Sequence, residues 1–183
     1  MKRYFGYICA LFAAIFNGMI GVFSVGIMHL GLHPFAIAFY KCLISLILVT
    51  SWLICTNKFY EWLIYLKKFY WKIAVCSLFG FFVLYFFETS AYGYEKVSVV
   101  VFLLLGTATI TTFILSALLQ KHKIRIYEIA SCILALIGLG LIFGMQDIHG
   151  IQLQGLILAI IAGFGYGVFI TISPIFNIGS GLI

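Results

Sequence analysis

Two ionisable residues, Glu88 and Lys41, stand inside long apolar runs of the sequence. A charged group in hydrocarbon costs at least about 2 kcal/mol, so it usually faces a partner or a water-filled cavity. One interpretation is structural: the two residues form a salt bridge, or Lys41 extends to the outer surface. The other is functional: one or both residues line a cavity that binds a substrate.

Aromatic residues accompany Glu88 at helical spacing. Phe81, Tyr85, Glu88 and Tyr92 follow at intervals of four, three and four residues, which places them on one helical face. A carboxylate between aromatic rings suits an organic cation, because charge attraction and cation–π contact act together. Aromatic residues make up 18% of the chain, so a face that only packs against lipid or another helix explains the same pattern.

Other polar residues in apolar runs are weaker candidates for such a lining. Asn17 lies in the middle of the first run, and Tyr166 has the corresponding place in the last one. Thr109, Thr112 and Ser116 share a helical face, although their hydroxyls can bond to their own backbone. The predicted substrate-binding residues are therefore Glu88, Lys41, Tyr85, Tyr92, Asn17 and Tyr166.

The sequence contains no motif of a catalytic, metal or nucleotide site. His29 and His33 are four residues apart, but Gly31 and Pro34 interrupt the helix that would bring them together. The glycine-rich segment 163–167 lies inside an apolar run with no preceding strand, which favours close helix packing. The five cysteines form no CxxC pair and are typical of small apolar packing residues. We expect no enzyme, no cofactor and no metal site.

The composition predicts a membrane protein. Of 183 residues, 64% are hydrophobic and only 9% are charged, whereas soluble domains carry roughly a quarter charged residues. In lipid, backbone groups must bond to each other, which leaves helices or a closed barrel. The apolar runs are about 20 residues or longer and do not alternate, so we expect an all-α polytopic fold. The six predicted spans are 5–28, 35–55, 73–92, 97–119, 126–145 and 155–175.

Basic residues are distributed unevenly between the two sides of these spans. The N-terminus and the second and fourth connections hold nine Lys and Arg residues, whereas the alternate connections hold only Lys96. This asymmetry predicts a multi-pass protein of the cell (inner or plasma) membrane with a cytoplasmic N-terminus. The net charge of +6 sits in these short clusters, so we expect the lipid bilayer and no nucleic acid as a partner. The nine are Lys2, Arg3, Lys58, Lys67, Lys68, Lys72, Lys121, Lys123 and Arg125.

The longest connection, 56–72, has an amphipathic pattern. Its apolar residues recur at helical spacing, and Glu61 and Lys68 fall on the opposite face. The pattern predicts a helix lying on the membrane surface, with an irregular loop as the alternative. The apolar positions are Phe59, Trp62, Leu63, Leu66 and Tyr70.

A weak internal repeat links the first and sixth predicted spans. Five small or apolar residues recur at one constant offset, although small residues also match by chance. Because five spans separate the two starts, the second copy would enter the membrane in the opposite direction, as in inverted-repeat transporters. The first-span residues are Gly6, Ile8, Ala10, Ala13 and Gly18, and their matches are Gly155, Ile157, Ala159, Ala162 and Gly167.

Four segments carry a resemblance to a known family. In residues 11–18 an aromatic residue and a glycine follow small residues, and in residues 33–41 a proline leads to an aromatic and then to Lys41. Residues 91–98 form a turn between helices, and residues 136–142 end a helix rich in glycine and leucine. These patterns resemble the EamA-type drug/metabolite transporter superfamily, whose fold has two inverted repeats of five helices each.

The resemblance implies a secondary carrier for a small metabolite or an organic cation. Residues 1–148 would form the first repeat, and residues 149–183 would form the start of a truncated second repeat. The sequence departs from the family where residues 105–109 lack a proline, where residues 121–123 lack a glutamate, and where Lys41 replaces an arginine. Alternatives are a non-transporting membrane subunit or truncated product, and a lipid flippase.

Length is a further departure, because the family's ten helices need about 300 residues. The resemblance therefore implies a truncated chain, or a half that pairs with a second copy or with the missing second half. One repeat and one further helix would not enclose a cavity with access from both sides. We expect the isolated 183-residue monomer not to transport.

Overall fold

The computed structural model describes residues 2–119, 126–144 and 152–176 of the chain. Within these residues the protein is helical and contains no strand, which confirms the all-α prediction. The elements in order are α1 (Lys2–His29), α2 (Pro34–Cys55), α3 (Phe59–Ser77), the π-helix η1 (Leu78–Phe86), α4 (Phe87–Ala91), α5 (Val97–Leu119), α6 (Ile126–Gly144) and α7 (Leu153–Ile175).

Four segments of the described chain are long and apolar enough to cross a membrane, namely Pro34–Cys55, Phe59–Ala91, Val97–Leu119 and Leu153–Ile175. The first and fifth predicted spans correspond to α1 and α6, which contribute the shorter apolar stretches Ile15–His29 and Ile129–Gly138. Large apolar side chains cover the outside of the bundle: Phe16 on α1 is 67% exposed and Leu48 on α2 is 65% exposed. Such a surface suits lipid, and the protein is a multi-pass membrane protein.

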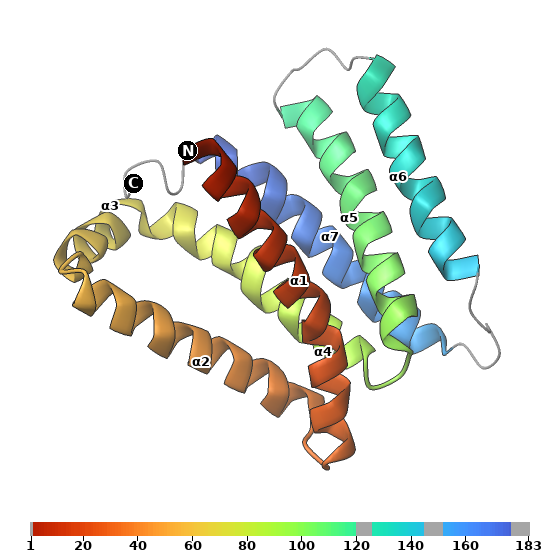
Figure 1. The fold of residues 1–183 in the computed structure, drawn as a ribbon, viewed down its shortest axis with the longest axis horizontal. Helices are drawn as coiled ribbons and strands as arrows, with labels where there is room; N and C mark the ends of the chain where they lie inside the picture. Colours follow the sequence, from red (N-terminus) through yellow and green to blue (C-terminus); the bar gives the residue numbers. More distant parts are fainter. Residues whose placement is uncertain (1, 120–125, 145–151, 177–183) are drawn as a thin grey trace.

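The centre of the bundle is the pair α5 and α7. These two helices pack more extensively than any other pair in the described structure, and α7 also packs on η1 and α4. Figure 1 shows α2 at one edge of the bundle and α6 at the opposite edge, next to α5. Any site between α1, η1, α5 and α7 is therefore enclosed on several sides by helices.

Glycines allow α7 to lie directly against its neighbours. A Cβ at Gly167 would stand 2.6 Å from the Thr111 Cβ, and one at Gly163 would stand 2.9 Å from the Thr107 Cβ. On the other side of α7, a Cβ at Gly165 would stand 2.5 Å from a methyl of Val83 in η1. Helix packing thus explains the glycine-rich segment, as the sequence predicted.

The helix predicted for the long connection is present, because α3 begins at Phe59, and the alternative of an irregular loop is wrong. Trp62 and Leu66 are half-buried, whereas Glu61 and Lys68 on the opposite face are exposed. Non-helical angles at Phe69 (φ −118°, ψ 22°) separate this amphipathic part from the membrane-spanning part. Its position on the membrane surface stays a prediction.

The turn between α1 and α2 separates the two histidines. Gly31 has φ +90°, a left-handed conformation that favours glycine, and it follows the end of α1 closely. His33 caps α2 instead, because its ring Nδ1 accepts a hydrogen bond from the Phe35 N–H over 3.4 Å. Among the described residues, no group of three His, Cys, Asp or Glu side chains could hold a metal ion.

Helices α1 and α7 run in opposite directions, as Figure 1 shows from the red start of α1 and the dark blue end of α7. An inverted repeat requires this arrangement for the two matched spans. The repeat itself, with its boundary near residue 148, stays a prediction.

Candidate functional site

A cavity of about 420 Å³ lies between α1, η1, α4, α5 and α7. Its lining includes five of the six residues predicted to bind substrate: Asn17, Tyr85, Glu88, Tyr92 and Tyr166. We refer to it as the Glu88 cavity. The structure thus brings together residues that lie far apart in the sequence, while their role in binding stays a prediction.

The sixth predicted residue, Lys41, lies in a neighbouring cavity of about 460 Å³ between α1, α2 and η1. Phe81 and Tyr85 line both cavities, so the two are separated by little more than aromatic rings. Lys41 therefore stands beside the Glu88 cavity and not in its lining.

A tyrosine holds the carboxylate of Glu88. The Tyr92 hydroxyl donates a hydrogen bond of 2.7 Å to Glu88 Oε1. Tyr92 is itself only 5% exposed and belongs to a buried cluster with Ala91, Val100 and Ala159. One oxygen of the carboxylate is therefore fixed by a side chain that the core holds in place.

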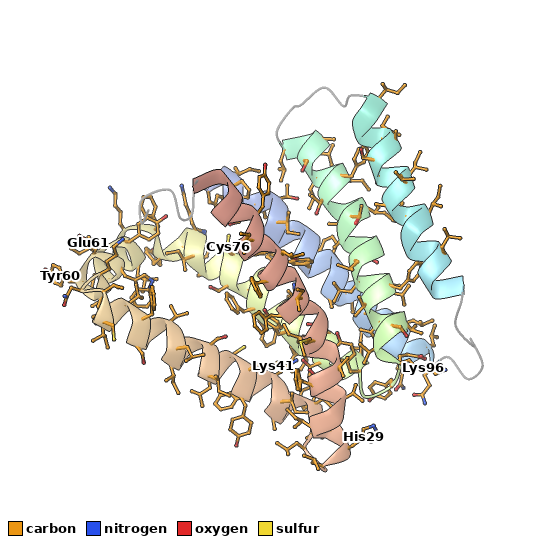
Figure 2. All side chains as sticks on the ribbon, in the orientation of Figure 1. His29, Lys41, Tyr60, Glu61, Cys76 and Lys96 are labelled. Atoms are coloured by element: carbon orange, nitrogen blue, oxygen red, sulfur yellow. The ribbon has the colours of Figure 1, made fainter. Side chains whose placement is uncertain are left out.

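The amine of Lys41 bonds to a different residue. Lys41 Nζ donates to Thr89 Oγ1 over 3.3 Å, and Thr89 is fully buried. Lys41 lies about two turns after the start of α2 and beside α1 (Figure 2). The hydrogen bond to Thr89 favours a position of the Lys41 amine inside the bundle over an extension to the outer surface.

Glu88 and Lys41 also differ from the expected salt-bridged pair, because the structure gives them different hydrogen-bond partners. Successive residues of a helix point about 100° apart. Glu88 therefore faces the cavity, whereas Thr89 faces α2. The opposite charges of Lys41 and Glu88 still attract each other through space.

Sequence reasoning missed two features of this site. One is Thr89. The only sequence feature that could have identified it is that it is a polar residue next to Glu88 within an apolar run. The other is the π-helix Leu78–Phe86, which carries Phe81 and Tyr85 into the site. A Cβ at Gly80 in this helix would stand 2.5 Å from the ring of Phe169, so α7 lies directly against it. Short π-helical segments often occur at functional sites.

The predicted hydroxyl face of α5 lies outside the Glu88 cavity. Thr109, Thr112 and Ser116 line another cavity of about 500 Å³ between α5, α6 and α7. Thr109 Oγ1 donates to the Leu105 carbonyl at 2.8 Å, which confirms the expected bond to its own helix. Thr112 instead reaches across to α7, where its hydroxyl donates to the Gly167 carbonyl at 3.4 Å.

The chemistry available in the Glu88 cavity is binding by charge and aromatic surface. The rings of Phe81 and Tyr85 lie 5.9 Å apart between centroids, and Tyr92 and Tyr166 add further rings. Glu88 is the one lining residue with a formal charge among those the structure describes there. A carboxylate beside aromatic rings can bind a positively charged group by charge attraction and cation–π contact.

Comparison with known proteins identifies the family. The model of the EamA-like transporter family matches residues 4–144, which is most of the chain. Comparison with curated proteins and with solved structures gives no significant match. The match includes the helices that carry Asn17, Lys41, Tyr85 and Glu88, and it agrees with the all-α membrane fold. The chain belongs to the EamA-like transporter family.

Proposed function

We propose that this protein is a secondary carrier that binds a small organic cation in the Glu88 cavity. The observation that supports this most is the Glu88 carboxylate, held by Tyr92 and surrounded by aromatic side chains. A volume of about 420 Å³ suits a small molecule, since ligand pockets commonly measure about 300–1,000 Å³.

Charge is the reason to prefer a cation over an anion. A carboxylate in a mostly apolar cavity attracts a positive ligand strongly, because little water is present to screen the interaction. An anion in the same cavity would meet like charge and would lose its hydration. The amine of Lys41 attracts Glu88 through space, but its hydrogen bond goes to Thr89 outside the lining, so the carboxylate has no cation bonded to it in the structure described.

Transport of matched compounds tests this function. We use the term full-length protein for this chain assembled with a second copy or with a second half. In proteoliposomes it should transport a primary or quaternary ammonium at least about tenfold faster than a neutral compound of the same shape. A carboxylate of similar size should not be transported. Equal transport of the neutral compound or the carboxylate would contradict the proposal. Flux of a labelled phospholipid without flux of the cation would favour a flippase instead.

The orientation in the membrane is part of the same proposal, with the N-terminus in the cytoplasm. Tyr60 and Glu61 lie toward one end of the bundle, and His29 and Lys96 lie toward the other (Figure 2). The basic cluster of α3 therefore lies at the end opposite to Lys96. Basic residues favour the cytoplasmic side of a membrane.

Cysteine labelling checks this orientation. In a variant without the native cysteines, Lys67→Cys should react with a membrane-impermeant maleimide only from the cytoplasmic side. Lys96→Cys is the matched control at the other end and should react only from outside. Both side chains are exposed, so access is not limited by burial. Labelling of Lys67→Cys from outside in intact cells would overturn the orientation.

A further inference from the structure

We refer to the cavity lined by Thr109, Thr112 and Ser116 as the hydroxyl-lined cavity. This cavity and the Glu88 cavity lie one after the other along α5. The Glu88 cavity contacts α5 at Val101, Leu104 and Leu105. The hydroxyl-lined cavity contacts the same helix from Leu105 onward to Ala117. The hydroxyl-lined cavity thus begins on α5 where the Glu88 cavity ends, and it lies nearer the Leu119 end of that helix.

Leu105 and Tyr166 line both cavities and therefore stand at their junction. We propose that the hydroxyl-lined cavity is a second subsite on the path of the substrate, and that the ring of Tyr166 closes the passage between the two. This inference rests on the proposed carrier function and adds a second binding place and a barrier to it.

The fold holds Tyr166 firmly at this junction. Its ring packs against the buried cluster of Leu84, Leu104 and Ala162. On either side of it in α7, Gly163 and Gly167 press against the backbone of α5. Because these contacts fix α7 on α5, the Tyr166 ring cannot leave the junction without a change in its rotamer or a shift of α7.

The hydroxyls define the kind of group that the second subsite accepts. Thr109 and Thr112 use their hydrogens in bonds to the carbonyls of Leu105 and Gly167. A hydroxyl oxygen retains acceptor capacity when its hydrogen is donated. The lining can therefore accept hydrogen bonds from the N–H groups of an ammonium ion. None of the lining residues that the structure describes is a carboxylate.

Access to an engineered thiol tests the barrier. In the full-length protein without native cysteines, Ser116→Cys places a thiol in the second cavity. The probe is a methanethiosulfonate reagent with a trimethylammonium group, which does not cross membranes. Applied to vesicles of defined orientation from the Leu119 end of α5, it should react. Applied from the Val97 end, it should react at least about tenfold more slowly, because Tyr166 blocks the passage.

Substitutions at the junction should change this sidedness. Tyr166→Ala should bring the two rates to within about a factor of three, whereas Tyr166→Phe keeps the ring and should keep the difference. Phe164→Ala is the matched control, since Phe164 is an aromatic residue of α7 that is 50% exposed and lines neither cavity. If Tyr166→Ala does not fold, Leu105→Ala widens the same junction from α5 and should also make the rates converge.

Two results of the labelling experiment would overturn the inference. A thiol at position 116 that reacts from neither side would show that the second cavity is not an aqueous path. Equal rates from both ends with Tyr166 intact would show that the ring is no barrier. Glu61→Gln removes a carboxylate from the exposed face of α3, outside both cavities, and should leave the sidedness unchanged. The labelling rates are measured without transport, so a lack of cation selectivity in the transport assay would count against the carrier proposal alone.

Discussion

Glu88→Gln should weaken the binding of a cationic substrate by about 30-fold, with little loss of folded protein. The substitution removes the negative charge but keeps the shape of the side chain. The amide oxygen of Gln can still accept the hydrogen bond from the Tyr92 hydroxyl. A lost interaction with a charged group is worth about 2 kcal/mol, which corresponds to this change in affinity. Equilibrium binding of a labelled ammonium compound to the purified full-length protein measures it.

Two variants serve as controls for this result. Glu61→Gln removes a carboxylate from the exposed face of α3, toward one end of the bundle and away from Lys41 (Figure 2), and should leave binding unchanged. Tyr85→Phe keeps the ring and most of its π-face, so it should cost much less than Glu88→Gln. Unchanged binding in Glu88→Gln would contradict the carboxylate's proposed role.

A purely structural role for Glu88 predicts another outcome. In that case Glu88→Gln would leave Lys41 without its charge partner and lower the yield of folded protein, and Lys41→Met would restore it. We expect no such rescue, because Lys41 already bonds to Thr89. Restored folding together with intact transport in the double variant would refute the substrate-site hypothesis.

Gly163→Ala should destabilise the folded protein by about 3 kcal/mol, the largest packing effect that the structure predicts. The added methyl group would overlap the Leu104 carbonyl oxygen and stand 2.9 Å from the Thr107 Cβ. The conflict involves backbone, so α7 must move away from α5, and this pair is the most extensive contact of the bundle. The fraction of monomer that survives titration with sodium dodecyl sulfate, followed by size-exclusion chromatography, measures the loss.

Gly138→Ala is the matched control for the packing prediction. Gly138 also lies in an apolar helix, α6, but among the described residues nothing beyond the nearby backbone of its own helix lies within 4 Å of the position of its Cβ. Alanine favours helices over glycine by about 1 kcal/mol, so this variant should be as stable as the unaltered protein or slightly more so. Equal stability of the Gly163→Ala and Gly138→Ala proteins would show that α7 does not need its direct contact with α5.

The sequence by itself determined the class of the fold. It also determined which residues lie together on one face of the third predicted span, 73–92. Apolar runs of the length of a bilayer must become helices, because lipid offers no other partner for the backbone. Helical spacing then places Phe81, Tyr85, Glu88 and Tyr92 on one side, and all four line the same cavity. The π-helix leaves this face intact, although the spacing argument assumed α-helical geometry throughout.

Only the tertiary structure decided how the helices place these side chains against one another. Whether Lys41 meets Glu88 or Thr89 depends on how α2 is rotated and shifted against α4, which local spacing does not encode. The position of Tyr166 between two cavities likewise follows from the glycines that bring α7 onto α5 and η1. Sequence patterns specify which residues share a face of one helix, whereas contacts between helices arise from close packing of surfaces that are distant along the chain.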